Sequence, residues 1–184
     1  TGSTLILSVG NQNTLTGTFT GGGPFSTVSN NEGVRVSGEL TCALGICALS
    51  GDCVMSVNTC SGVTVDTSGA VRSESSSMAS LTGTSQPSGL GVEILGLLEP
   101  LDTSTLELRG TGGPSSGNGI YMTGVVTTVA SNAILQLVGT GGGQLGTTDR
   151  NVGVLFDTNI LAPAGLHVVV SGQGGLGTGS MNFG

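Results

Sequence analysis

Apolar and polar residues alternate along most of the chain, in short runs that begin or end at a glycine. A period of two places successive side chains on opposite faces of a strand, whereas a helix would need a period near 3.6. No segment keeps the helical period over a useful length, and Ser, Thr, Val and Gly, which are common throughout, disfavour a helix. The pattern therefore predicts an all-β chain of short strands with one buried face.

Two sequence marks recur along the chain. The first is a short apolar strand that ends in glycine, as in CALSG, ASLTG and VVVSG. Its glycines are Gly17, Gly51, Gly83, Gly110, Gly139 and Gly172. The second is a glycine followed by alternating apolar residues, as in GVRVSG and GIYMTG. Its glycines are Gly33, Gly62, Gly91, Gly119 and Gly153.

The spacing of the two marks indicates a repeat. From each second mark to the next first mark the interval is 18 to 21 residues, whereas the reverse interval varies from 8 to 16. A frame of constant length, interrupted at one place by a loop of variable length, is typical of stacked coils. We therefore predict one domain over residues 1–184, a parallel β-solenoid (β-helix) of about six coils of roughly 30 residues. An antiparallel sandwich also has short strands and Gly-rich turns, but it gives no reason for the marks to stay in phase.

The marks also predict how residues stack between coils. Two residues before each first-mark glycine stands an aliphatic residue, and this set is the predicted core column: Leu15, Leu49, Leu81, Leu108, Leu137 and Val170. A third strand is expected within the frame, for example at 125–129. Gly and Asn between the strands are expected to form turns, because they tolerate positive φ.

The charge of the chain excludes several classes of partner. Four Arg and no Lys stand against eleven Asp or Glu, for a net charge of −7, and nothing resembles a basic stripe. We therefore expect no nucleic acid and no anionic membrane surface as partner. No apolar run reaches the roughly 18 residues of a membrane span. Because the chain begins at Thr1, we expect a processed form or a piece of a longer protein.

All four cysteines lie in one short segment. An even, clustered set in a Lys-free chain indicates two disulfides and an extracellular or cell-surface location, the predicted disulfide residues being Cys42, Cys47, Cys53 and Cys60. Cys53 and Cys60 flank a variable loop, and Cys42 and Cys47 flank the preceding turn, but the spacing does not choose among the three pairings. A zinc site is disfavoured because no C-x2-C pair is present, and four free thiols are the third alternative.

Two glycine patterns match the G-x-G-x-x-G spacing of a dinucleotide-binding loop: Gly141, Gly143 and Gly146, and Gly172, Gly174 and Gly177. Such a loop needs a helix directly after the glycines, and here a strand pattern follows the first set. We therefore predict turns and no cofactor.

Catalytic and metal-binding patterns are equally weak. The acids are scattered, and His167 stands alone in LHVVVSG, where an outward position is expected. Asp149, Asn151 and Asp157 carry oxygen ligands, but their spacing matches no calcium-binding motif and a solvated loop is favoured. We predict no enzyme, no catalytic residue and no metal site.

The repeats LELRGTGGPSSGNGIYMTG and LQLVGTGGGQLGTTDRNVGV resemble the glycine-rich β-strand repeats of very large bacterial surface proteins, akin to filamentous-haemagglutinin-type adhesins. The resemblance spans nearly the whole chain and is weakest in the cysteine segment. It implies export, a right-handed β-helical shaft, and adhesion or matrix formation. No catalytic residues come with it.

The two ends of the sequence stop in mid-pattern, so that they would complete one coil if copies followed head to tail. Unpaired strand edges at the ends of a solenoid favour such a contact. The residues predicted at this interface are Leu5, Ile6, Leu7, Met181 and Phe183. An arbitrary boundary within a longer chain is the alternative.

We accordingly expect an extracellular structural protein, forming a filament or the shaft of a giant cell-surface adhesin. Its expected partners are copies of itself, and surface glycans are further candidates at the variable loops. The alternative is a solenoid that binds ice or polysaccharide through a specific face. Thr residues in LTGTFTG and VVTTVA suggest ice binding, but they do not recur in one column across all coils.

Overall fold

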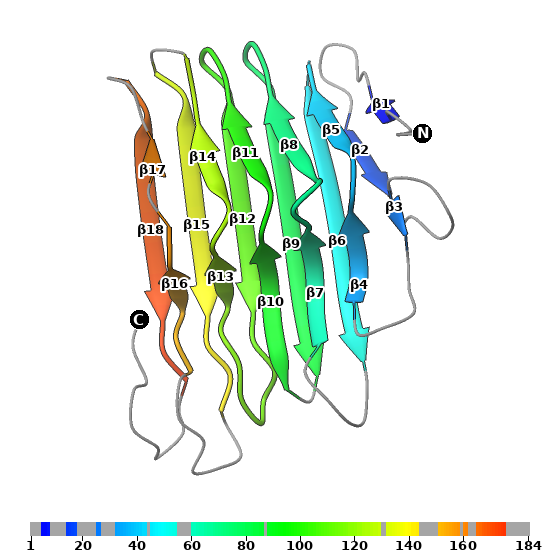
Figure 1. Cartoon of the computed structure of the whole chain (residues 1–184), viewed down its shortest axis with the longest axis vertical. Coiled ribbons are helices and arrows are strands. Elements are labelled where there is room, and N and C mark those ends of the chain that lie inside the picture. The colour runs from blue at the N-terminus through cyan, green and yellow to red at the C-terminus, as the bar shows by residue number, and fades with distance from the viewer. Residues whose placement is uncertain are drawn as a thin grey trace.

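The computed structural model describes residues 32–43, 45–54, 60–86, 88–129, 132–143, 151–158, 160–161 and 165–175, together with the strands at 5–7, 14–17 and 25–26. These residues form eighteen strands and no helix, and the strands lie side by side in one continuous stack (Figure 1).

The strands form three sheets of six strands, which we call sheets A, B and C. Sheet A consists of β1 (Leu5–Leu7), β5 (Glu39–Cys42), β8 (Ala70–Ser73), β11 (Leu97–Pro100), β14 (Val125–Thr127) and β17 (Ile160–Leu161). Sheet B consists of β2 (Thr14–Gly17), β6 (Ile46–Val54), β9 (Met78–Gln86), β12 (Thr105–Thr111), β15 (Ile134–Thr140) and β18 (His167–Gln173). Sheet C consists of β3 (Phe25–Ser26), β4 (Glu32–Val36), β7 (Cys60–Val65), β10 (Gly89–Ile94), β13 (Ile120–Met122) and β16 (Val154–Phe156).

The predicted all-β parallel solenoid is confirmed. From β4 onward the chain visits sheets C, A and B in turn, and each strand pairs in parallel with its equivalent one coil earlier. The strand expected at 125–129 is β14. The number of coils is slightly smaller than the expected six. Four complete turns join the five parallel strands of sheet C, and β3 pairs antiparallel with β4, so it does not extend this series.

The register confirms most of the predicted core column. Leu49 pairs with Leu81, Leu81 with Leu108, Leu108 with Leu137, and Leu137 with Val170. The placement of Leu15 is wrong, because Leu15 pairs with Cys47 and it is Gly17 that pairs with Leu49. A shift of two residues leaves every side chain on its original face, so alternation alone cannot detect it.

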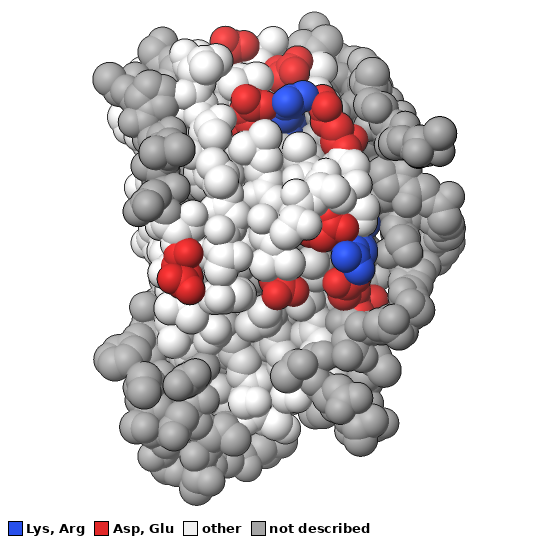
Figure 2. Space-filling view, viewed as in Figure 1, with Lys and Arg blue, Asp and Glu red and all other residues white. Residues whose placement is uncertain are grey.

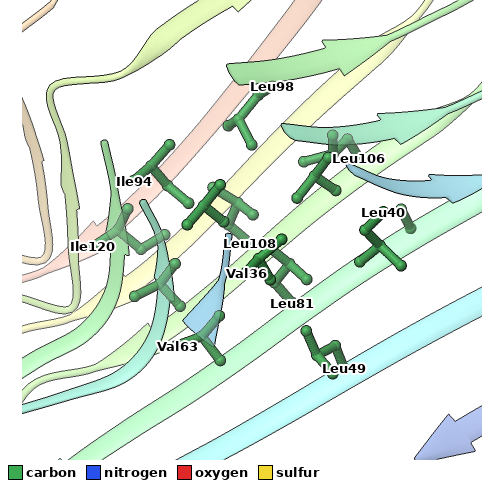
Figure 3. Packing of buried hydrophobic residues seen from close by; sticks show 14 of the residues in the cluster. Val36, Leu40, Leu49, Val63, Leu81, Ile94, Leu98, Leu106, Leu108 and Ile120 are labelled. Atoms are coloured by element: carbon green, nitrogen blue, oxygen red, sulfur yellow. The ribbon is translucent and has the colours of Figure 1, made fainter. Parts of the chain in front are cut away.

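Aliphatic side chains fill the interior between the three sheets (Figure 3). Leu81, Leu108 and Leu137 from sheet B are completely buried, and Val63 and Ile120 from sheet C are as well. Burial of each such side chain contributes about 1.5–3 kcal/mol. The stacked columns therefore form a single apolar core that runs along the axis.

The glycines of the two marks meet each other inside the coil, at the border of this core. A Cβ atom added to Gly83 would lie 2.0 Å from the carbonyl oxygen of Gly91. A Cβ added to Gly110 would lie 1.9 Å from the oxygen of Gly119. Real Cβ atoms do not approach a backbone oxygen so closely, so here sheets B and C pack backbone against backbone. We call the set the glycine spine; its pairs are Gly51 and Gly62, Gly83 and Gly91, Gly110 and Gly119, and Gly139 and Gly153.

The glycines of the spine have a different role from the turn-forming role expected of Gly and Asn between the strands. None of its members has positive φ among the described residues. Positive φ occurs instead at Gly45, Gly89, Gly117, Gly143 and Gly165. The mark glycines are therefore required by the space between two sheets and not by backbone conformation.

Replacing Gly110 with Ala tests the glycine spine. The new methyl group would meet the backbone of Gly119, which cannot move without disturbing sheet C, so we expect a loss of about 3 kcal/mol or slightly more of unfolding free energy. The midpoint of urea unfolding measures this loss. Thr111→Ala, at the exposed neighbouring position, should cost only about 0.5 kcal/mol. Equal midpoints for the two variants would contradict the close approach.

Candidate functional site

The last coil leaves core positions uncovered. Strands β16, β17 and β18 each have a strand neighbour on one side only within the described part of the chain. Val168 and Val170 continue the columns of Leu135 and Leu137, but they are 38% and 50% exposed, whereas both leucines are fully buried. His167 precedes them and is exposed, at the expected outward position. This end of the described stack is an open strand edge with exposed aliphatic side chains.

The residues predicted at a head-to-tail interface are only partly described. Leu5, Ile6 and Leu7 form β1, which lies at the opposite edge of sheet A from β17. Met181 and Phe183 lie outside the described residues. The interface itself stays a prediction.

Charged residues avoid both ends of the sequence. All Arg, Asp and Glu residues fall between positions 32 and 157. Three Arg residues in that range make ion pairs: Arg35 with Glu32 and Asp66, Arg72 with Glu39 and Glu99, and Arg109 with Glu107. Figure 2 shows each blue patch against red neighbours on one face. Strands β1, β2, β17 and β18 thus lack the charges that commonly block pairing at sheet edges.

The Asp66 carboxylate accepts several hydrogen bonds at the turn between sheets C and A. It accepts hydrogen bonds from Ser37 Oγ at 2.6 Å, Ser68 Oγ at 2.7 Å and Arg35 Nε at 3.0 Å. Burial by itself would raise the pKa of Asp66, but these donors outweigh it and lower the pKa to about 2. The Ser68 N–H also donates to the carboxylate, at 2.8 Å. The role of Asp66 is therefore to hold a turn.

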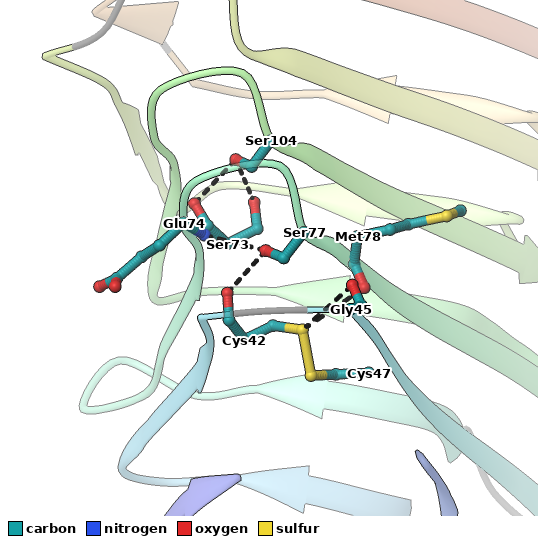
Figure 4. The surroundings of a disulfide bond; sticks show 8 residues. All are labelled: Cys42, Gly45, Cys47, Ser73, Glu74, Ser77, Met78 and Ser104. Atoms are coloured by element: carbon teal, nitrogen blue, oxygen red, sulfur yellow. Dashed lines mark hydrogen bonds between the residues drawn. A yellow bond between two sulfur atoms is a disulfide. The ribbon is translucent and has the colours of Figure 1, made fainter. Parts of the chain in front are cut away.

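The Cys42–Cys47 disulfide closes the turn between β5 and β6 (Figure 4). In the next coil Ser77 holds the equivalent turn, because its Oγ donates to the Cys42 carbonyl oxygen at 2.7 Å. One coil further on, Ser104 Oγ donates to the Ser73 carbonyl oxygen at 2.8 Å. The disulfide therefore replaces a hydroxyl contact at one level of a corner that is otherwise held by serine.

The prediction of a second disulfide is wrong in this structure. Cys53 and Cys60 are buried free thiols. Cys60 Sγ donates instead to the carbonyl oxygens of Cys53, at 3.5 Å, and Gln86, at 3.6 Å. Burial, with a smaller contribution from Cys60, raises the pKa of the Cys53 thiol to about 12, so it stays protonated at neutral pH.

A hollow of about 280 Å³ lies where the strands of sheet B lead into the variable loops. Thr84, Thr111 and Thr140 line it, and they stand directly beside one another on β9, β12 and β15. Its other lining residues are Ser85, Gln86, Gly112, Pro114, Gly141 and Gly142, so none of the lining side chains is charged.

Threonine lines the hollow from only three coils, which carry Thr84, Thr111 and Thr140. Asp52 takes the position below Thr84 and accepts a hydrogen bond from its hydroxyl, and Gln173 takes the position beyond Thr140. This agrees with the expectation that Thr does not recur in a column across all coils. A Thr stands directly after four of the six first-mark glycines, at Thr18, Thr84, Thr111 and Thr140, and this signal would have found the three residues that line the hollow.

The first dinucleotide-like glycine pattern falls at the end of β15. Gly141 packs against the backbone of Asn151, and Gly143 has a φ of 86°, a conformation that favours glycine. Gly172 lies inside β18, and no helix follows either pattern in the described chain. Gly146 and Gly177 lie outside the described residues.

The weak metal candidates do not come together. Asn151 is buried and its Oδ1 accepts a hydrogen bond from the Gly117 N–H at 3.1 Å, which corrects the expected solvated loop at this position. Asp157 is exposed, and Asp149 lies outside the described residues. Across the described residues no group of three His, Cys, Asp or Glu side chains is placed to hold a metal ion. The same residues include no helix with the length and apolar character needed to cross a membrane.

Comparisons with known proteins return no relative of this chain. No protein-family model matches it, no curated protein matches it, and no solved structure matches it.

The Asp66 carboxylate gives the stability a defined pH dependence. Its pKa is lowered in the folded state, so its contribution is present above the ordinary aspartate pKa near 3.9 and is lost as pH falls towards 2. At about 1.4 kcal/mol per pKa unit, a lowering of about two units corresponds to about 2–3 kcal/mol. The free energy of unfolding, measured with urea at pH 5 and at pH 2, should differ less between the two pH values in Asp66→Asn than in the wild type. Thr67→Ala, at an exposed neighbouring position, should keep the wild-type difference, and the same difference in Asp66→Asn would contradict the assignment.

Proposed function

We propose that this chain is part of an extracellular structural protein, a filament or the shaft of a giant cell-surface adhesin. Its coils would stack on those of the next block or subunit. The observation that carries the proposal is the uncovered end of the core at Val168 and Val170, each half or nearly half exposed although the residue one coil earlier is fully buried. An additional coil would remove these side chains from water, which is the main driving force for such an association.

Stacking would add the same contacts that hold the coils together within the chain. Strands β15 and β18 pair over seven residues, from Ile134 with His167 to Thr140 with Gln173. Contacts in a solenoid are made only between neighbouring repeats. Each further coil would therefore repeat this pairing and lengthen the rod. Contacts with other molecules would be made at the variable loops that follow the strands of sheet B.

The disulfide supports an extracellular location. Bonds such as Cys42–Cys47 form and persist in oxidising compartments and are rare in the cytosol of most cells. The proposal assigns the chain no catalytic residue and no cofactor. All Arg residues in the described part of the chain make ion pairs with nearby acids, as expected of side chains that hold a structural protein together.

Binding of a neutral polysaccharide is a second candidate function, favoured by the hollow on sheet B. The hydroxyls of Thr84, Thr111 and Thr140 can both donate and accept hydrogen bonds, as sugar hydroxyls do. Ser85 also lines the hollow, and its buried Oγ has no hydrogen-bond partner within the described chain. An uncharged lining of this kind fits a neutral sugar better than an anionic one.

Assembly in solution tests the first candidate. We expect association that increases with protein concentration, measured by light scattering after size-exclusion chromatography, and rods in negative-stain micrographs. Val170→Arg should weaken association at least roughly tenfold, because it places a charge on an open strand edge. Thr82→Arg, which changes the outer face of the middle of sheet B, should associate like the wild type. Monomers alone at every concentration would refute the proposal.

Retardation in gels containing a neutral polysaccharide tests the second candidate. Thr111→Val removes the central hydroxyl of the hollow at nearly constant volume and should abolish retardation. Thr82→Val, outside the lining, should leave it intact. Equal migration of all three proteins with and without polysaccharide would exclude this candidate, and thermal hysteresis would indicate ice binding instead.

A further inference from the structure

The two ends of the described stack present corresponding strand edges. At one end β17 and β18 are the last strands of sheets A and B, and at the other end β1 and β2 are the first strands of the same sheets. All pairings within sheets A and B are parallel. A strand edge at one end could therefore accept the first strand of a second copy in the same direction.

The register of the six strands in sheet B determines which residues would meet. Thr14 occupies the same position along its strand as His167, through the successive partners Ile46, Met78, Thr105 and Ile134. By the same succession Thr16 corresponds to Val169, and Gly17 to Val170. In sheet A, Leu5 corresponds to Ile160 through Leu40, Val71, Leu98 and Val126.

We propose that a second copy of this chain docks on the last coil in this register, with β2 on β18 and β1 on β17. Thr14 then stands beside His167 and Leu5 beside Ile160. The inference rests on the proposed stacking function and adds its geometry. A single displacement of the second copy along the axis, by six coil spacings, satisfies sheets A and B together, because each of these sheets has six strands.

The composition of the four edge strands supports a second copy as the occupant. None of them contains Asp, Glu, Lys or Arg, although strands in the middle of the stack carry ion-paired Arg and Glu side chains. Edge strands in monomeric proteins commonly carry charges that prevent pairing. Here both of the edges that would pair lack that protection, so neither opposes the contact.

Docking would restore the environment that the core columns have inside the chain. Val168 and Val170 would be covered by the strand that carries Leu15 and Gly17, as Leu135 and Leu137 are covered by β18. Sheet C would behave differently, because β3 lies antiparallel on the outer edge of β4 and would face β16. The parallel ladder would thus continue through sheets A and B.

Disulfide trapping between two differently tagged chains tests the register. One chain carries Thr16→Cys and the other Val169→Cys, and Val169 is half exposed, so its replacement disturbs no core contact. Directly opposed residues on paired strands meet the Cα separation of about 4.4–6.8 Å that a disulfide needs. We expect this pair to cross-link several-fold more completely than a mismatched pair of Thr14→Cys and Val169→Cys. Mass mapping identifies the bond and separates it from Cys42–Cys47.

The outcomes distinguish the register from the function on which it rests. Preferential cross-linking of Thr16→Cys with Val169→Cys supports both. Rods or oligomers in light scattering, with equal cross-linking of the two pairs or a preference for the mismatched pair, overturn the register and leave stacking intact. Absence of association in both pairs overturns the register and the proposed function together.

Discussion

The close approach of two backbones at the glycine spine determines the cross-section of this solenoid. At Gly110 and Gly119 the backbones of sheets B and C touch, whereas directly beside this contact the side chains of Leu108 and Ile120 fill the space between the same sheets. The interior of each coil is thus wedge-shaped, with an aliphatic core at one end and bare backbone at the other. A side chain at the narrow end would force the sheets apart and leave the wide end poorly packed. The abundance of glycine, 35 residues in all, follows in part from this requirement.

The corners of the coil use small polar groups in place of large ones. Ser77 and Ser104 hold successive turns between sheets A and B by bonding to backbone carbonyls, and the disulfide serves the same corner one level earlier. Between sheets C and A, Asp66 gathers two serine hydroxyls and a guanidinium. Short side chains suit these positions, because neighbouring coils are only about 4.8 Å apart.

The sequence predicts the fold well because the solenoid repeats one pattern several times. Alternation and constant spacing identified the strands of sheets B and C, and the pairing of Leu81 with Leu108 followed directly. Leu15 was misplaced because its register depends on a single repeat, and a two-residue slip preserves alternation. The state of Cys53 and Cys60 depends on side-chain direction at the end of one coil, which spacing does not encode. The hollow beside Thr111 arises from three separate coils, so no single stretch of sequence contains it.

The loops that leave sheet B have variable length, whereas the backbone contacts at their bases are constant. Under tension along the axis, the force acts along the hydrogen bonds between coils, and the outermost coil carries the fewest contacts. Such a rod would yield by peeling one coil at a time. Each coil of roughly 30 residues would release on the order of 100 Å of chain. The Cys42–Cys47 bond lies within one turn and would not limit this extension. If the coils stack as proposed, such a rod would be stiff at rest and would lengthen in steps under tension.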